Sequence, residues 1–181
     1  MATDKELIRH IAQGDEQALR RLIDAYGDGV ARLAMRIMCD PYDVEEVTQE
    51  TFIRVWRHAG RFDAEFAAAT WIFRIAANLC YDRLRRRRLR HVLLPMRREE
   101  NWPLASSADQ PLVDQELWTH YHRAVEALPP KQHLVFSLRE LEGKSNQEVS
   151  QLLGWSADQV KANYYQAKRQ IQKVLRRYGI Q

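Results

Sequence analysis

The chain has 181 residues, a length that allows one ordinary domain or two small ones. Hydrophobic residues make up 45% and charged residues 29%, a composition that supports a core and disfavours wholesale disorder. The 7 glycines and 6 prolines are too few for a loop-rich all-β protein. No apolar run reaches the roughly 18 residues of a transmembrane helix. The first ten residues lack an apolar signal core, so we expect a cytoplasmic protein without direct membrane insertion.

The charges are unevenly distributed, although the net charge is only +4. Five acids and no base lie from Asp40 to Glu50, whereas six of the eight residues from Arg83 to Arg90 are arginine. A basic segment favours a polyanionic partner and an acidic segment favours a protein surface, with a solvated helix face as the alternative for each. Cys39 and Cys80 have no CxxC spacing, so we expect reduced, partly buried thiols.

The pattern of polar and apolar residues is helical nearly throughout. Sustained period-two alternation is absent, so we expect an all-α fold. Helix starts are indicated by capping boxes, in which a short polar side chain and a residue three positions later satisfy the free N–H groups of a first turn. Four such boxes pair Thr3 with Glu6, Asp43 with Glu46, Ser145 with Glu148, and Ser156 with Gln159.

A helix predicted over residues 44–57 has one apolar face and one face that suits a protein partner. The outward face carries Glu45, Glu46, Gln49, Glu50 and Ile53. An exposed isoleucine among carboxylates and an amide is typical of a binding patch with an apolar anchor. A metal site is the weaker alternative, because its four carboxylates lack a histidine or a shaping glycine loop. Its ligands would be Asp40, Asp43, Glu46 and Glu50.

The helix predicted from Thr70 to about Arg90 combines a core face with a basic face. The core face has Ile72, Ile75, Ala76 and Leu79. A second stripe, bordered by Trp71, consists of Arg74, Asn78, Tyr81, Arg85 and Arg88. Arginines hold phosphates and aromatic rings stack on exposed bases, so this stripe favours binding of a single nucleic-acid strand. The alternative is a basic helix whose long side chains only solvate the surface.

Residues 91–112 interrupt the helical pattern with three prolines and two serines, which indicates a linker. It divides the chain into two predicted helical domains, 1–90 and 113–181. Fully extended, the linker spans roughly 70 Å, so the two domains can contact separate DNA elements.

The C-terminal block has the pattern of a helix-turn-helix. A helix capped by Ser145 ends at Gly154, and the next begins at Ser156. The second helix turns its core stripe inward and a DNA-compatible face outward, where lysine and arginine attract phosphate and amide or aromatic groups contact base edges. The outward and flanking residues are Asp158, Lys161, Ala162, Tyr165, Gln166, Lys168 and Arg169. An amphipathic helix that packs on another domain is the alternative. For His120, His122 and His133, packing is favoured over metal binding.

No catalytic constellation is present. The sequence lacks a Walker loop, GxSxG, HExxH and a cysteine with a plausible histidine partner, so we expect neither catalysis nor a cofactor or metal. Two other function classes stay open at this point. One is a helix-turn-helix regulator with a helical sensor domain, and the other is a metal-dependent DNA-processing enzyme that uses the acids of residues 40–50.

Three segments together resemble bacterial RNA polymerase sigma factors of the extracytoplasmic-function (ECF) class. They are DVEEVTQETFIRVWR (43–57), TWIFRIAANLCYDRLRRRR (70–88) and ALPPKQHLVFSLRELEGKSNQEVSQLLGWSADQVKANYYQAKRQIQKVL (127–175). The resemblance covers nearly the whole chain in family order. It implies sigma region two in the first domain and region four in the second.

The resemblance also implies partners and roles. The chain would bind core polymerase, at the clamp of the largest subunit and the flap of the second-largest, and an anti-sigma factor would silence it and hold it at a membrane. Clamp docking falls on Glu46, Gln49, Glu50 and Ile53. Opening of the −10 element and capture of its single strand fall on the 62–69 loop and Trp71, Arg74, Asn78, Tyr81, Arg85 and Arg88. Duplex −35 recognition falls on Arg139, Ser156, Lys161, Ala162, Tyr165, Gln166, Lys168 and Arg169.

Overall fold

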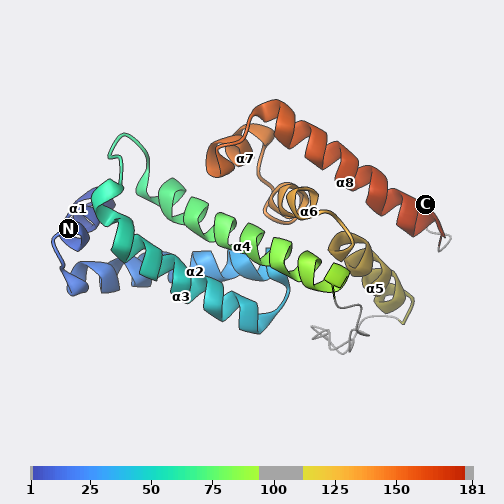
Figure 1. The fold of residues 1–181 in the computed structure, drawn as a ribbon, viewed down its shortest axis with the longest axis horizontal. Coiled ribbons are helices and arrows are strands. Elements are labelled where there is room, and N and C mark those ends of the chain that lie inside the picture. Colours follow the sequence, from blue (N-terminus) through green and yellow to red (C-terminus); the bar gives the residue numbers. More distant parts are fainter. Residues whose placement is uncertain (1, 94–111, 178–181) are drawn as a thin grey trace.

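The computed structural model describes residues 2–93 and 112–177, and every regular element in those two ranges is helical. This confirms the predicted all-α class. The first range contains α1 (Asp4–Ala12), α2 (Glu16–Met38), α3 (Pro41–His58), the 3₁₀ turn η1 (Ala59–Arg61) and α4 (Ala68–Leu93). The second contains α5 (Leu112–Glu126), α6 (Pro130–Phe136), the π-helical turn η2 (Ser137–Leu141), α7 (Asn146–Leu153) and α8 (Ala157–Arg177). Figure 1 shows α2, α3 and α4 running side by side.

Three of the four predicted capping boxes form as expected, those of Thr3, Ser145 and Ser156. The box of Asp43 with Glu46 is wrong. Asp40 caps α3 instead, because Pro41 has a fixed φ and no N–H and therefore suits the first helical position. Asp43 lies within the first turn of α3, where its carboxylate is available to the arginines of α4.

The faces predicted for the N-terminal helices are largely those observed. Val44, Val47, Phe52 and Val55 bury the inner side of α3, while Ile53 is exposed on the other side. On α4 the predicted core residues lie in the buried cluster or pack against it, so the basic stripe lies on a different side of the helix. α4 ends three residues beyond the predicted boundary at residue 90. Residues 94–111 of the predicted linker lie outside the described residues.

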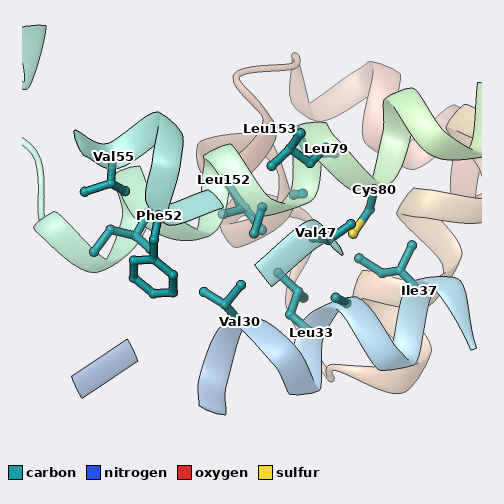
Figure 2. Close-up of a cluster of buried hydrophobic side chains, with 14 of the residues drawn as sticks. Val30, Leu33, Ile37, Val47, Phe52, Val55, Leu79, Cys80, Leu152 and Leu153 are labelled. Carbon is teal, nitrogen blue, oxygen red and sulfur yellow. The ribbon is translucent and has the colours of Figure 1, made fainter. Parts of the chain in front are cut away.

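The C-terminal domain has its own small core and also shares the larger one. Ala124, Val125, Leu128, Phe136, Ala167 and Ile171 form the small cluster, which joins α5, α6 and α8. A second set belongs to the cluster of the N-terminal helices and consists of Leu134, Val135, Leu138, Val149, Leu152, Leu153 and Val160. Figure 2 shows Leu152 and Leu153 in the same cluster as Ile37, Val47 and Leu79. The two predicted domains therefore pack on one another.

Candidate nucleic-acid and protein interfaces

The outer face of α3 presents an apolar side chain among polar ones. Ile53 is 43% exposed. The neighbouring Gln49 donates to Glu45 at 3.1 Å, and Glu50 accepts from Arg54 at 3.0 Å. We call Gln49, Glu50 and Ile53 the α3 patch. Its charges are paired within one helix, so the isoleucine is the part of the patch with most to gain from a partner.

Glu46, the fourth residue predicted for this patch, has a different partner. Its carboxylate accepts a hydrogen bond from Arg83 of α4 at 2.5 Å, and the same arginine approaches Asp43 at 3.8 Å. Arg87 pairs with Asp40 at 3.1 Å and also with Asp43. Two arginines of the basic run thus neutralise the acidic start of α3. In the described residues no three or more histidine, cysteine, aspartate or glutamate side chains are arranged to hold a metal ion.

The basic stripe of α4 meets the C-terminal domain along its first half. Arg74 donates from Nε to the carbonyl of Leu152 at 3.0 Å and from a terminal nitrogen to that of Gln151 at 2.6 Å. The ring of Tyr81 lies edge-on to that of Trp155, with centroids 5.8 Å apart. Asn78 between them is half-buried. Two predicted strand-binding residues, Arg74 and Tyr81, therefore contact α7 and the turn that follows it.

The rest of the stripe is open to solvent or packs locally. Arg85 is exposed and its guanidinium lies 5.8 Å from the centre of the Tyr81 ring. Arg88 is exposed and lines a cavity of about 320 Å³ between α4 and the α5–α6 turn. Trp71, which borders the stripe, packs on Phe62 with ring centroids 5.1 Å apart. This contact joins α4 to the preceding loop, which was also predicted to bind the strand.

The outward face of α8 is the most open of the predicted surfaces. Tyr165 is 67% exposed, and Lys161, Ala162 and Arg169 are exposed around it. Gln166 is also exposed, although its side-chain oxygen accepts from Gln132 at 2.9 Å. This face can enter a groove of duplex DNA without a change in the helix itself.

The remaining residues predicted for duplex recognition have structural contacts. Ser156 caps α8 through a mutual pair of hydrogen bonds with Gln159, both 3.1 Å. Arg139 donates to the carbonyl of Lys144 at 3.1 Å and lies 4.7 Å from the centre of the Tyr164 ring. Lys168 lies 5.5 Å from the same ring. These contacts hold the groups in position and leave part of their donor capacity unused.

Sequence reasoning missed three residues that join the domains. His133 of α6, assigned only to packing, donates from Nε2 to the carbonyl of Ile37 at 3.0 Å, since a carbonyl can only accept. Burial lowers the pKa of this imidazole to about 4, helped by nearby Arg87 and opposed by the bond to Ile37. Arg36 of α2 pairs with Glu142 at 3.2 Å, and Trp155 contacts Tyr81. No local periodicity distinguishes such residues from ordinary core or surface positions.

The two cysteines are free and poorly suited to chemistry. Burial raises the pKa of the Cys80 thiol to about 12 and that of Cys39 to about 11. At neutral pH both are therefore protonated thiols rather than nucleophilic thiolates. Among the described helices none is long and apolar enough to cross a bilayer.

Comparison with known protein families gives two matches that coincide with the predicted domains. Residues 22–90 match the model of sigma-70 region 2, and residues 120–171 match that of sigma-70 region 4. The first match runs from within α2 to near the end of α4 and includes the α3 patch and the basic stripe. The second covers the helix-turn-helix.

Similar proteins extend over nearly the whole chain. The ECF RNA polymerase sigma factor SigW of Bacillus subtilis is 26% identical over 180 residues, which are 95% of this chain and 96% of SigW. SigE of Mycolicibacterium smegmatis, another ECF sigma factor, is 30% identical over 93% of this chain and 66% of its own length. The ECF sigma-E factor of Salmonella typhimurium is 28% identical, over 93% and 92% of the two chains.

Two solved structures share the fold. The structure of CnrH in complex with the cytosolic domain of CnrY has a TM-score of 0.61 at 23% identity, covering 95% of this chain and 96% of that one. The sigma factor RpoE in complex with the anti-sigma factor NepR from Bartonella quintana has a TM-score of 0.62 at 17% identity, covering 87% and 96%.

Proposed function

Because the chain belongs to the ECF class of RNA polymerase sigma factors, we propose that it binds core polymerase through the α3 patch, opens the −10 element on α4 and recognises the −35 element with α8. Core polymerase binding and promoter-specific initiation follow from membership of this family. The assignment of surfaces is ours, and the observation that carries it is the order of the region-2 and region-4 matches along the chain. The region-2 match also favours this function over a regulator with a helical sensor domain.

For polymerase docking, support comes from the shape and charge of the α3 patch. A half-exposed isoleucine gains by burial in a partner, roughly 25 cal/mol for each Å² of apolar surface removed from water. Glu50 beside it favours a basic partner surface and adds orientation more than affinity. We assign Glu46 primarily to its contact with Arg83 and only secondarily to polymerase. The two charged partners of a half-buried salt bridge are harder to separate than those of an exposed one.

For strand capture, the chemistry of the α4 stripe provides the support. Arginines neutralise phosphates, and an aromatic face returns about 1–3 kcal/mol for each stacked base. This offsets the few kcal/mol that unstacking a base costs, so melting needs no nucleotide hydrolysis. We therefore propose that the chain performs no catalysis of its own.

For duplex recognition, α8 presents exposed hydrogen-bond donors around Tyr165. Each phosphate contact adds modest, salt-sensitive affinity, so one small domain binds weakly by itself. Attachment of both domains to one polymerase makes the second DNA contact effectively intramolecular. Specific binding should consequently depend on the polymerase.

We further propose a cytoplasmic location and control by an anti-sigma factor. CnrH and RpoE were both solved with a bound partner, the cytosolic domain of CnrY and the anti-sigma factor NepR. The same kind of partner suits this chain, whose surfaces for polymerase and duplex DNA are exposed and can be covered.

The test is transcription in vitro from fragmented genomic DNA, with start-site mapping. Core polymerase with this chain should produce a small set of new starts that share upstream −10 and −35 sequences. Core polymerase alone is the control. Starts that are the same with and without the chain would disprove the proposal, and so would equally tight promoter binding by the chain without polymerase.

A further inference from the structure

We infer that Gln132, on α6, is a positioning residue for base recognition, because it fixes the side-chain amide of Gln166 so that the NH2 group faces the DNA. The inference rests on the proposed role of α8 in duplex recognition and specifies its chemistry. The base that Gln166 recognises is one that offers acceptors in the major groove. Guanine offers two, N7 and O6.

The two glutamines meet within the C-terminal domain, where Nε2 of Gln132 donates to Oε1 of Gln166 at 2.9 Å. Gln132 precedes Phe136 by one turn of α6, so both side chains leave the same side of that helix. Phe136 stacks there on the ring of Tyr164 and shares the small core with Ala167 of α8. Figure 1 shows α6 beside α8. Both glutamines lie inside the region-4 match, so their contact is internal to one domain.

The burial of Gln132 decides which way round the two amides lie. Only 8% of this residue is exposed, and its Oε1 is buried with no hydrogen-bond partner among the described residues. A buried oxygen left unpaired is better tolerated than a buried amide nitrogen, which would leave its donors unmet. Nε2 of Gln132 therefore takes the available partner, and the oxygen of Gln166 is the acceptor.

The same burial makes this contact hard to give up when DNA binds. If Gln166 turned its oxygen toward a base, both ends of the Gln132 amide would be buried without partners. A buried donor left unmet costs its full desolvation free energy, whereas a new bond from Gln166 to a base only replaces one that it makes with water. We therefore expect Gln166 to keep its bond with Gln132 in the DNA complex.

A glutamine held by its oxygen recognises a different base from a free glutamine. A free one binds adenine with two bonds, in which its oxygen accepts from N6 and its nitrogen donates to N7. Gln166 is exposed beside Tyr165, but its oxygen is held toward α6, so it presents the two N–H donors of the amide. These donors match the two acceptors of guanine, whereas adenine has a donor beside its N7.

The experiment selects promoters from a library randomised across the −35 element, with the complex of core polymerase and the full chain. Gln166→Ala first identifies the base position that this side chain contacts, as the position whose preference it abolishes. The parent should favour guanine over adenine there by roughly fivefold or more. Gln166→Glu keeps one acceptor for Gln132 and presents a second to the DNA, so the preference should move to cytosine, whose N4 donates.

Gln132→Met tests the positioning residue itself. Methionine is similarly long and unbranched but has no donor, so it frees the Gln166 amide and removes the unpaired buried oxygen. The ratio of guanine to adenine should fall to roughly one or below, because a free amide can bind adenine. The urea midpoint should be retained, a combination that a merely structural role would not produce. Leu134→Met, a swap of similar volume at a buried position of the same helix, is the matched control and should leave the ratio unchanged.

The outcomes separate this inference from the function on which it rests. If Gln166→Ala abolishes a preference that Gln132→Met leaves unchanged, Gln166 contacts the base but Gln132 does not position it. Adenine as the preferred base of the parent would also overturn the inference. If Gln166→Ala alters no position while Tyr165→Ala weakens −35 binding, α8 recognises the duplex without Gln166. If neither variant changes the selection, the role of α8 itself is wrong.

The Gln166→Glu variant keeps the test decisive if Gln132→Met does not fold. Its substitution lies at an exposed position and preserves the acceptor for Gln132, so the fold should be retained. A move to cytosine supports the assignment of the amide. Continued selection of guanine by Gln166→Glu would contradict it.

Discussion

Nε2 of His133, on α6, donates a hydrogen bond across the domain boundary to the backbone carbonyl of Ile37, on α2, at 3.0 Å. The imidazole is buried, and burial lowers its pKa to about 4. At neutral pH the folded chain therefore holds this side chain in its neutral form. The charged groups that line the adjoining cavity are Arg87, Arg88, Arg123 and Glu126.

Burial of the His133 imidazole predicts that the chain loses stability on mild acidification. Since the pKa is lower in the folded state than the ordinary value near 6.5, the unfolded state takes up the proton first, and stability falls as the pH drops from about 6.5 toward 4. Between pH 7 and pH 5 the loss should be about 1–2 kcal/mol in the free energy of unfolding by urea. Glu6 and Glu148, whose pKa values are lowered, remain ionised in this range.

His133→Gln is the matched control for this prediction. A glutamine can still donate to a carbonyl but does not titrate, so the difference between pH 7 and pH 5 should shrink. A pH dependence equal to that of the parent would show that other groups cause it.

The basic run of α4 is predicted to divide into structural and DNA-binding arginines. Arg83→Ala removes the partner of Asp43 and Glu46 from a half-buried site and should lower the free energy of unfolding by about 1–2 kcal/mol. Arg86→Ala, at an exposed position three residues on, should change it by less than about 0.5 kcal/mol. Urea titrations of both variants check this, and equal losses would contradict the division.

The α3 patch is predicted to bind polymerase through its isoleucine. Ile53→Ala should weaken binding to core polymerase by about tenfold, since a central apolar anchor is worth more than about 1 kcal/mol at an interface. The unfolding midpoint should stay near that of the parent because the side chain is 43% exposed. Ile23→Ala on α2, with 38% exposure, is the control and should bind normally. Titration of the labelled chain with core polymerase measures the affinity of both variants. Normal binding by Ile53→Ala would show that the docking site lies elsewhere.

The outward face of α8 is predicted to contact the −35 duplex through Tyr165. Tyr165→Ala should weaken promoter binding by the polymerase complex by about 1 kcal/mol or more, without a change in stability, because the ring is 67% exposed. Gln172 is also exposed on α8, about two helical turns beyond Tyr165, and Gln172→Ala should have no effect. Footprints on a promoter from the mapped starts provide the readout. Equal −35 protection in parent and Tyr165→Ala would exclude this contact.

Much of the fold was predictable because its signals are local. The boxes of Thr3, Ser145 and Ser156 formed, since each needs only residues within one turn. The apolar side of α3 was likewise evident from periodicity. The box of Asp43 failed for an equally local reason, as Asp40 followed by Pro41 starts the helix earlier. The site residues on α3, α4 and α8 remain predictions, and what the structure adds is where each one lies.

The sequence by itself determined the helices, their polar and apolar sides, and the two-part organisation that matches sigma regions 2 and 4. Only the tertiary structure decided which polar helix faces are exposed to solvent and which are covered by another segment. Arg74 and Arg85 belong to the same predicted stripe of α4. Only Arg74, however, donates hydrogen bonds to the carbonyls of Gln151 and Leu152, nearly 80 residues away in the sequence. Periodicity specifies the direction in which a side chain leaves its helix. What covers it depends on contacts between distant segments, and here the partner is backbone, which every residue has and which no sequence pattern distinguishes.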